Sequence, residues 1–460
     1  MKYSIKNLLL SCALLLAASL TVGAQTTYSG YFLEGYDYRY QMNPAIGNET
    51  MVVAMPAIGN FNVATHGSLN LKNIIYTLNG KTVLFTNPGI STSEVMSHVK
   101  DRNRLGLNTK IDLMSVGFKA LGGYNVVSLS ALANVETSVP GAFFSLAKEG
   151  LTNTTYDISN MFANVNAYGQ IALNHSRDIK KVPGLRVGAT LKVLVGVGNV
   201  DFDFKNAHLQ LDENEWIAQT NADVYASVGG LRFDKKTSEK TGRDYVSGAN
   251  LDGGFAPNGF GLGFDLGAEY KWRDFNFSLA ILDFGFMSWG KTQHASTNGP
   301  HTVNTGAFTF NASGSAPNSF SNEWDRLSKD LEELYQLRDM GALSSRTKML
   351  GATLNVGASY ELPAYRKLHF GLLSTTRING KYSWTQVRLS ANVRPVKLLS
   401  VDINGVVGTF SGGFGWLFNF HAPGFNLFAG MDYTLGKLSK QGVPLNSNSA
   451  FNFGLNFPLK

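Results

Sequence analysis

The chain has 460 residues, of which 44% are hydrophobic and 12% aromatic, and its 16% of charged residues is low against the ~25% of an average soluble protein. The 49 glycines exceed the usual share of about 7%, but they follow no Gly-X-Y repeat, so the composition excludes both a collagen-like and a disordered chain. The formal charge of +7 is spread along the chain without a cluster of Lys and Arg, which excludes a dedicated nucleic-acid-binding protein.

The first 24 residues have the pattern of a secretory signal peptide. Lys2 and Lys6 precede the apolar residues 8–20, and small residues then lead to a cleavage site before Gln25. The apolar stretch is shorter than the ~20 residues of a spanning helix, which disfavours an uncleaved anchor. Because the single cysteine, Cys12, lies in this stretch, we expect a mature chain without disulfides, cysteine-ligated zinc or a cysteine nucleophile.

Long runs of the chain alternate between apolar residues and small or polar ones, which is the period of a β-strand. The runs at 185–198 and 259–272 are far longer than the ~5–6 residues of a soluble strand. They are long enough for a tilted membrane strand, which needs about 9–11 residues. We therefore expect the bulky apolar face to contact lipid and the other face to line a lumen. The charged residues of that inner face are Arg186, Lys192, Asp265, Glu269 and Lys271.

These runs predict an all-β fold, a transmembrane antiparallel β-barrel of about 14 strands within a range of about 12–16. A closed barrel is the one sheet that crosses lipid with every backbone group paired. The alternative is a large soluble β-sandwich or propeller, which would have shorter strands and more charges on its wet faces. The expected strands lie near residues 52–66, 103–119, 123–136, 161–177, 184–204, 216–232, 259–272, 274–289, 301–310, 348–362, 367–376, 380–394, 398–410, 413–421, 425–435 and 449–459, with 81–86 as a further candidate.

Two segments depart from the strand pattern. Residues 321–340 carry leucines at helical spacing before Gly341, which predicts an amphipathic helix in a long loop. Residues 140–150 form a short apolar piece that we interpret as a loop helix or a partial plug. The turns around 290–301 do not alternate cleanly between short and long, so the orientation of the middle loops stays open.

Motifs for catalysis, cofactors or metals are incomplete. Residues 145–148 match Ser-x-x-Lys and residues 240–242 match Lys-Thr-Gly of penicillin-recognising enzymes, but the intermediate Ser-x-Asn element occurs only at 390–392, in the wrong order. The glycine-rich residues 259–263 precede no helix that could bind a phosphate. The eight histidines form neither His-x-His nor His-Glu-x-x-His. We expect no catalytic, cofactor or metal site, and hence no enzyme.

Residues 25–50 are too rich in aromatic side chains for a free tail, and they contain Asn43, Pro44 and Ala45. This Asn-Pro-Ala motif shortly after a signal peptide resembles the start of the FadL-like outer-membrane barrels. The strands at 259–270, 278–289 and 451–457 are similar to those of an uncharacterised Bacteroidota-type barrel family. The resemblance implies that the motif belongs to a hatch in the barrel mouth and that hydrophobic compounds diffuse through the barrel.

The expected organisation is a signal peptide at 1–24, an N-terminal hatch or rim segment at 25–50 and an outer-membrane β-barrel at 51–460. Two functions remain open for a barrel in the outer membrane of a Gram-negative cell. One is a channel or transporter for hydrophobic or small solutes. The other is a structural or docking barrel in a secretion or surface assembly. The expected partners are outer-membrane lipid, hydrophobic small molecules and other outer-membrane proteins, but no nucleic acid.

Overall fold

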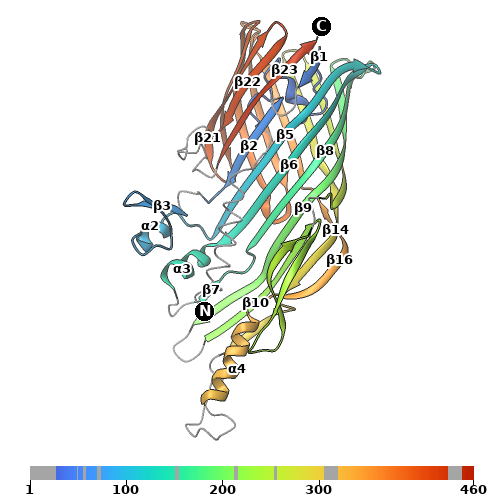
Figure 1. Ribbon diagram of the computed structural model, residues 1–460. Coiled ribbons are helices and arrows are strands. Elements are labelled where there is room, and N and C mark those ends of the chain that lie inside the picture. Colours follow the sequence, from blue (N-terminus) through green and yellow to red (C-terminus); the bar gives the residue numbers. More distant parts are fainter. Residues whose placement is uncertain are drawn as a thin grey trace.

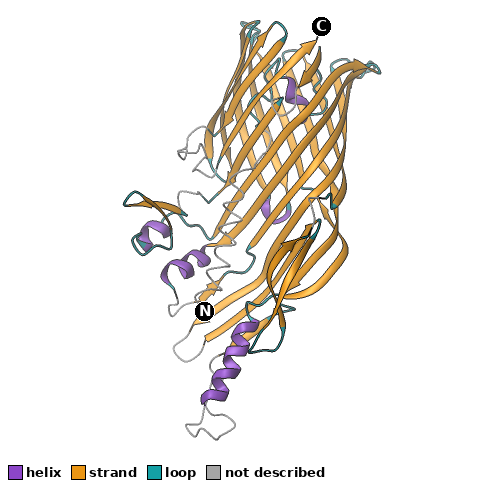
Figure 2. Cartoon of the chain, in the orientation of Figure 1, coloured by secondary structure: helices purple, strands orange, loops and turns teal. Residues whose placement is uncertain are grey.

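The computed structural model describes residues 27–48, 50–54, 59–69, 74–150, 155–211, 216–252, 256–304, 320–433 and 448–459. The expected signal peptide at 1–24 lies outside these residues. The described chain is dominated by long antiparallel strands that enclose a lumen (Figures 1 and 2). Among the described residues, no helix is long and apolar enough to cross a membrane.

The wall of the barrel has fourteen strand positions, here called columns. The barrel is closed because the last strand pairs with the first, with Phe457 opposite Val53. This confirms the expected transmembrane antiparallel β-barrel of about 14 strands with a loop helix. In order around the wall, the columns are β1 (Met51–Ala54) with β2 (Asn60–Gly67), β5 (Arg102–Ala120), β6 (Gly123–Pro140), β8 (Phe162–Asp178), β9 (Leu185–Leu211), β13 (Gly259–Trp272), β14 (Phe275–Ser296), β17 (Ala352–Glu361), β18 (Leu368–Ile378), β19 (Trp384–Val396), β20 (Leu399–Gly408), β21 (Gly412–Ala422), β22 (Phe425–Asp432) and β23 (Ser449–Leu459).

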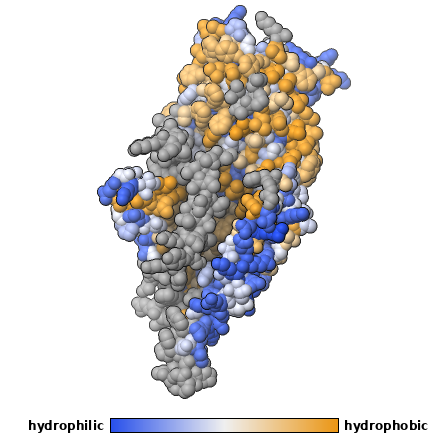
Figure 3. Space-filling view, viewed as in Figure 1, coloured by the Kyte–Doolittle hydropathy of each residue, from blue (hydrophilic) through white to orange (hydrophobic). Residues whose placement is uncertain are grey.

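The two faces of each wall strand differ as the period of two requires. On β13, Phe264 and Leu266 point outward and are 47% and 60% exposed, whereas Asp265 between them is 2% exposed in the lumen. The face of the barrel seen in Figure 3 is accordingly largely apolar, and the exposed large side chains of the other wall strands are apolar as well, so the barrel carries an apolar belt. This belt is the surface that lipid would cover.

The two rims of the barrel differ in the length of their connections. At the rim that holds Met51 and Leu459, neighbouring strands are joined by short turns such as Leu121-Gly122 and Arg273-Asp274. At the opposite rim most connections are long, as between β6 and β8 or between β14 and β17, although residues 409–411 alone join β20 to β21 (Figure 1). In outer-membrane barrels short turns face the periplasm and long loops face outward. In an outer membrane the short-turn rim would therefore face the periplasm, and the two rims are called periplasmic and extracellular below on that basis.

Part of the sheet continues past the extracellular rim. There β9 pairs with β10 (Trp216–Val228) instead of β13, and β14 pairs with β16 (Arg338–Met349) instead of β17. The runs predicted near 216–232 and 301–310 therefore add no column of their own to the barrel. The other elements of the long loops are β3 (Ile75–Leu78), β4 (Lys81–Leu84), α2 (Thr92–Met96), α3 (Gly141–Glu149), β7 (Thr155–Asp157), β11 (Leu231–Thr237), β12 (Asp244–Leu251), β15 (His301–Asn304) and α4 (Phe320–Glu333), with the 3-10 turn η5 (Gly380–Tyr382).

The structure corrects the predicted helix at 321–340. The helix α4 ends at Glu333, and Arg338–Met349 forms β16. Arg338 pairs with Ser296 of β14, so pairing with a distant strand overrides the local leucine spacing. The apolar piece at 140–150 is a loop helix, α3, and not a plug, because Phe144 packs on Phe85 beside the hairpin β3–β4, with ring centroids 5.2 Å apart.

The outward position of Phe264 gives a stability prediction. Replacing Phe264 by Arg should destabilise the inserted barrel by about 2–4 kcal/mol, because a guanidinium near the bilayer midplane loses its hydration. Thr190→Ser, on the inner face of the neighbouring strand, is the control and should change stability by less than about 1 kcal/mol. Unfolding in urea from lipid vesicles, followed by heat-modifiable migration on gels, measures both. Equal losses in the two variants would contradict the assignment of faces.

Candidate functional site: the lumen and residues 27–48

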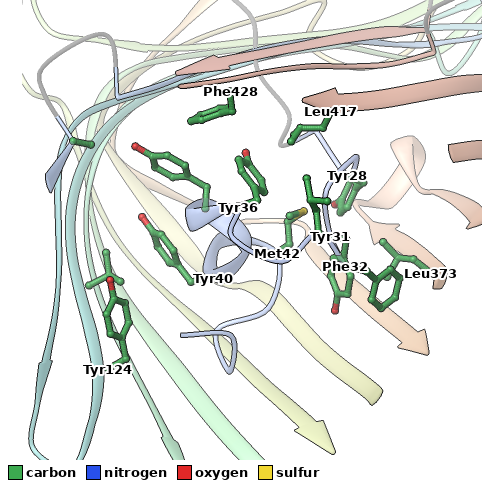
Figure 4. Close-up of a cluster of buried hydrophobic side chains, with 14 of the residues drawn as sticks. Tyr28, Tyr31, Phe32, Tyr36, Tyr40, Met42, Tyr124, Leu373, Leu417 and Phe428 are labelled. Carbon is green, nitrogen blue, oxygen red and sulfur yellow. The ribbon is translucent and has the colours of Figure 1, made fainter. Parts of the chain in front are cut away.

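Residues 27–48, here called the lumen segment, lie inside the barrel and not in its wall (Figure 4). Its aromatic side chains are buried against wall residues, and the ring centroid of Tyr36 lies 5.1 Å from that of Phe428. The phenol hydroxyls are satisfied as well, since Tyr36 donates to Asn452 (3.2 Å) and Tyr31 to Ser278 (3.1 Å). An aromatic ring on an apolar wall with its hydroxyl paired is a stable arrangement. The buried side chains of the segment include Tyr28, Tyr31, Phe32, Leu33, Tyr36, Tyr38, Tyr40 and Met42.

Tight turns fold the lumen segment into this space. Gly30 and Gly35 have φ of +85° and +84°, a conformation that glycine adopts without strain. The 3-10 turn η2 (Asp37–Gln41) follows, and the amide of Asn43 then donates to the carbonyl of Arg39 at 3.0 Å. The segment is thus compact and has little regular structure, so its position depends on side-chain contacts with the wall.

The Asn-Pro-Ala motif sits on two glycines of the wall. Gly188 of β9 and Gly267 of β13 are directly opposite each other. A Cβ atom at residue 188 would lie 2.0 Å from the carbonyl oxygen of Pro44, and one at residue 267 would lie 2.1 Å from Oδ1 of Asn43. These glycines form a depression that the motif occupies, and any larger side chain there would displace it.

Hydrogen bonds fix the motif in that depression. Within the motif, Oδ1 of Asn43 accepts the amide of Ala45 at 3.0 Å, which closes a turn. From the wall, Arg186 donates through Nε to the carbonyl of Ala45 (2.7 Å), and Asn174 donates to the carbonyl of Pro44 (3.2 Å). The structure therefore brings the sequence-predicted Arg186 together with Asn43, Pro44 and Ala45.

A buried ion pair holds the other end of the lumen segment. Arg388 of β19 and Asp432 of β22 are 2% and 3% exposed, and the guanidinium makes two parallel bonds to the carboxylate, of 2.8 Å and 3.1 Å. The same carboxylate accepts the amides of Tyr28 (2.9 Å) and Ser29 (3.0 Å). A bidentate pair of this kind is strong and directional. The sequence analysis did not predict either residue as a lumen residue. Both nevertheless stand at inward-facing positions of strands whose side chains alternate between the two faces.

The remaining predicted lumen charges fall into two groups. Lys192 and Asp265 lie in the middle of the lumen with their polar atoms 2.7 Å apart, and Asp283 lies 2.6 Å from the same ammonium. Glu269 and Lys271 lie with Arg186 near the periplasmic rim, where they line a cavity of about 300 Å³. The sequence reading did not predict Asp283, which stands at a bulge where β13 and β14 change register.

The lumen segment lies between two cavities. Tyr31, Phe32, Glu34 and Arg39 line the periplasmic cavity of about 300 Å³. Tyr28, Gln41 and Met42 line a second cavity, of about 100 Å³, with the mid-lumen charges. Both cavities are lined by ionisable side chains, whereas the segment between them is largely aromatic. In the described residues, no group of three or more His, Cys, Asp or Glu is placed to hold a metal ion.

Substituting a wall glycine tests the contact between the Asn-Pro-Ala motif and the wall without changing the motif itself. Gly267→Ala should displace Asn43 and loosen the lumen segment, because the added Cβ overlaps that side chain. Gly263→Ala is the matched control on the same strand, where the nearest atom to a new Cβ is 3.4 Å away. We expect faster tryptic cleavage of the folded barrel after Arg39, within the lumen segment, for Gly267→Ala alone. The same cleavage rate in both variants would contradict the role of this contact.

One protein-family model matches the chain, over residues 44–432, and its description is "Family of unknown function (DUF5723)". No curated protein matches. Among solved structures, the toluene transporter TodX of P. putida has 6% identity and a TM-score of 0.40, covering 94% of this chain and 98% of its own. A Pseudomonas aeruginosa FadL homologue has 9% identity and a TM-score of 0.37, with 95% and 98% covered. Because these TM-scores are below 0.5, function has to be argued from the residues of this chain.

Proposed function

The chain belongs to the family DUF5723, and since that description assigns no function, we propose one from the lumen: the protein is a gated outer-membrane channel for small solutes. The observation that carries the proposal is the lumen segment, which fills the barrel without being part of its wall. Side chains fill the interior of a barrel of about eight strands, and barrels of about 16–18 strands hold open water. A barrel of fourteen columns lies between these sizes, so a separate segment can close it and can also leave it.

The proposal includes export of the chain and its location in the outer membrane. Residues 1–24 would direct the chain across the inner membrane, and the apolar belt would then contact the lipid of a Gram-negative outer membrane. The barrel architecture fits that location. The periplasmic rim carries the short turns, so a solute from outside would reach the mid-lumen charges first and the lumen segment second.

The lining of the lumen favours small polar solutes over hydrophobic ones. A solute that follows the lumen passes ionisable residues on both sides of the lumen segment, among them Lys192 and Arg377 on one side and Glu269 and Lys271 on the other. An apolar molecule gains nothing from these charged groups, whereas a polar one can replace its hydration by hydrogen bonds to them. Hydrophobic molecules stay a second class of solute, for which the aromatic side chains of the lumen segment provide the contact surface.

A docking barrel is the second candidate function, and one observation favours it. The strands β9, β10, β14 and β16 extend the sheet beyond the extracellular rim, and this extension is hydrophilic on the surface seen in Figure 3. The helix α4 lies at its end (Figure 1), and the hairpin β11–β12 lies beside β16, where Lys235 pairs with Asp339 at 2.7 Å. A polar platform of this size is available to another outer-membrane protein without any passage through the lumen.

Removing the lumen segment separates the two functions. Deleting residues 28–42, while keeping the signal and all strands, should raise single-channel conductance in planar bilayers, because the aromatic barrier between the cavities is lost. Deleting residues 238–243, at the tip of the β11–β12 hairpin, is the control and should leave conductance unchanged. A barrel that assembles without residues 28–42 and still does not conduct would reject the channel and favour the docking barrel.

A further inference from the structure

The mid-lumen cavity of about 100 Å³ combines three cations with carboxylates that already accept hydrogen bonds. Its lining includes Lys110, Lys192 and Arg377 as cations and Glu136 and Asp283 as carboxylates. Its volume of about 100 Å³ is room for several water-sized groups. The lining therefore decides which small molecule could be stabilised there.

Both carboxylates of the cavity lining already accept a hydrogen bond on each oxygen. Both oxygens of Glu136 accept the amide of Asn379, at 2.8 Å and 2.6 Å. One oxygen of Asp283 accepts Lys192 (2.6 Å) and the other accepts Arg377 (3.2 Å). Asp265, outside the lining, is paired with Lys192. These acceptors are already matched to donors, so an incoming cation would have to break existing bonds.

Asp112 lies outside the lining and is also satisfied by neutral donors. It accepts Gln41 at 2.8 Å, Asn60 at 2.9 Å and Ser130 at 2.6 Å. This leaves little of the carboxylate for Lys110, whose Nζ is 3.9 Å away. The separation is beyond hydrogen-bond distance.

Two cationic side chains, by contrast, have donors to spare. Among the described residues, Lys110 donates no hydrogen bond, although its side chain is only 14% exposed. Arg377 uses Nη1 alone, towards Asp283 and Thr353, so its Nε and Nη2 are left over. In a cavity with room for water, an ammonium or guanidinium with unused donors binds water or an acceptor, and an acceptor of opposite charge forms the stronger hydrogen bonds.

We propose that this cavity is a binding site for a small carboxylate, held by Lys110 and Arg377. A carboxylate offers two acceptor oxygens, which suits a guanidinium edge together with an ammonium. The cavity size selects a free acid of few atoms. The biological use of the site rests on the proposed channel, in which it would select solutes on the extracellular side of the lumen segment. The binding itself requires no open channel.

The test measures acetate binding to the full-length, detergent-solubilised chain by saturation-transfer difference NMR. HEPES serves as the buffer because its anion, a sulfonate on a bulky ring, is too large as a whole for a cavity of about 100 Å³. We expect acetate to bind and acetamide, its neutral isostere, not to bind. Lys110→Gln should weaken acetate binding about tenfold or more, the ratio expected when a hydrogen bond to a charged group is lost. Lys110→Arg should largely restore binding, and heat-modifiable migration checks that each variant is folded.

Lys119→Gln is the matched control, since Lys119 lies on the same strand but is exposed near the periplasmic rim, and acetate binding should be unchanged. Equal binding of acetamide, unchanged acetate binding in Lys110→Gln, or no acetate binding by the folded chain would overturn the site. Chloride competing equally with acetate would overturn the carboxylate class. Acetate binding by a chain that never conducts would keep the site and reject the channel, whereas conductance without acetate binding would do the reverse.

Discussion

The demand that every backbone amide be hydrogen-bonded inside a membrane determines the rest of this structure. A sheet in lipid meets that demand only by closing on itself, and here the closure runs from β23 back to β1 and β2. Closure with fourteen columns then sets a lumen wider than the inward side chains can fill. The lumen segment occupies this space. Its tyrosines suit an interior with both apolar and polar side chains, because each ring packs against apolar groups while its hydroxyl can form hydrogen bonds.

The contacts of the lumen segment are of a kind that can be released. The Arg388–Asp432 pair holds the amides of Tyr28 and Ser29, and two wall glycines receive the Asn-Pro-Ala motif. The chain continues from the lumen segment into β1 at Met51, and the described contacts of the segment with the facing wall are hydrogen bonds and side-chain packing. In the proposed gate the segment would move while the hydrogen-bonded wall stays closed. This separation of a rigid wall from a detachable interior is the physical basis of the proposed gate.

Much of the barrel was predictable from the sequence, because the period of two is a local property. The run at 259–272 forms β13 with the same bounds, and its alternation correctly separated outward Phe264 from inward Asp265. What failed depends on partners far along the chain. The stretch after Glu333 has helical leucine spacing but becomes β16 by pairing with β14. Likewise, the strand alternation places Arg388 in the lumen, but it cannot show that Asp432 and Ser29 form hydrogen bonds with Arg388 there.

A disulfide between the lumen segment and the wall tests the central claim most directly. A Cβ atom at Gly415 of β21 would lie 2.7 Å from Oγ of Ser29, so the sulfur of a cysteine at residue 29 can reach a cysteine at residue 415. The single natural cysteine, Cys12, lies in the expected signal peptide and gives little background. We predict that Ser29→Cys with Gly415→Cys forms this disulfide, that the oxidised barrel stays closed in planar bilayers, and that reduction allows openings. A folded barrel in which the disulfide does not form, or whose openings are the same before and after reduction, would contradict the account.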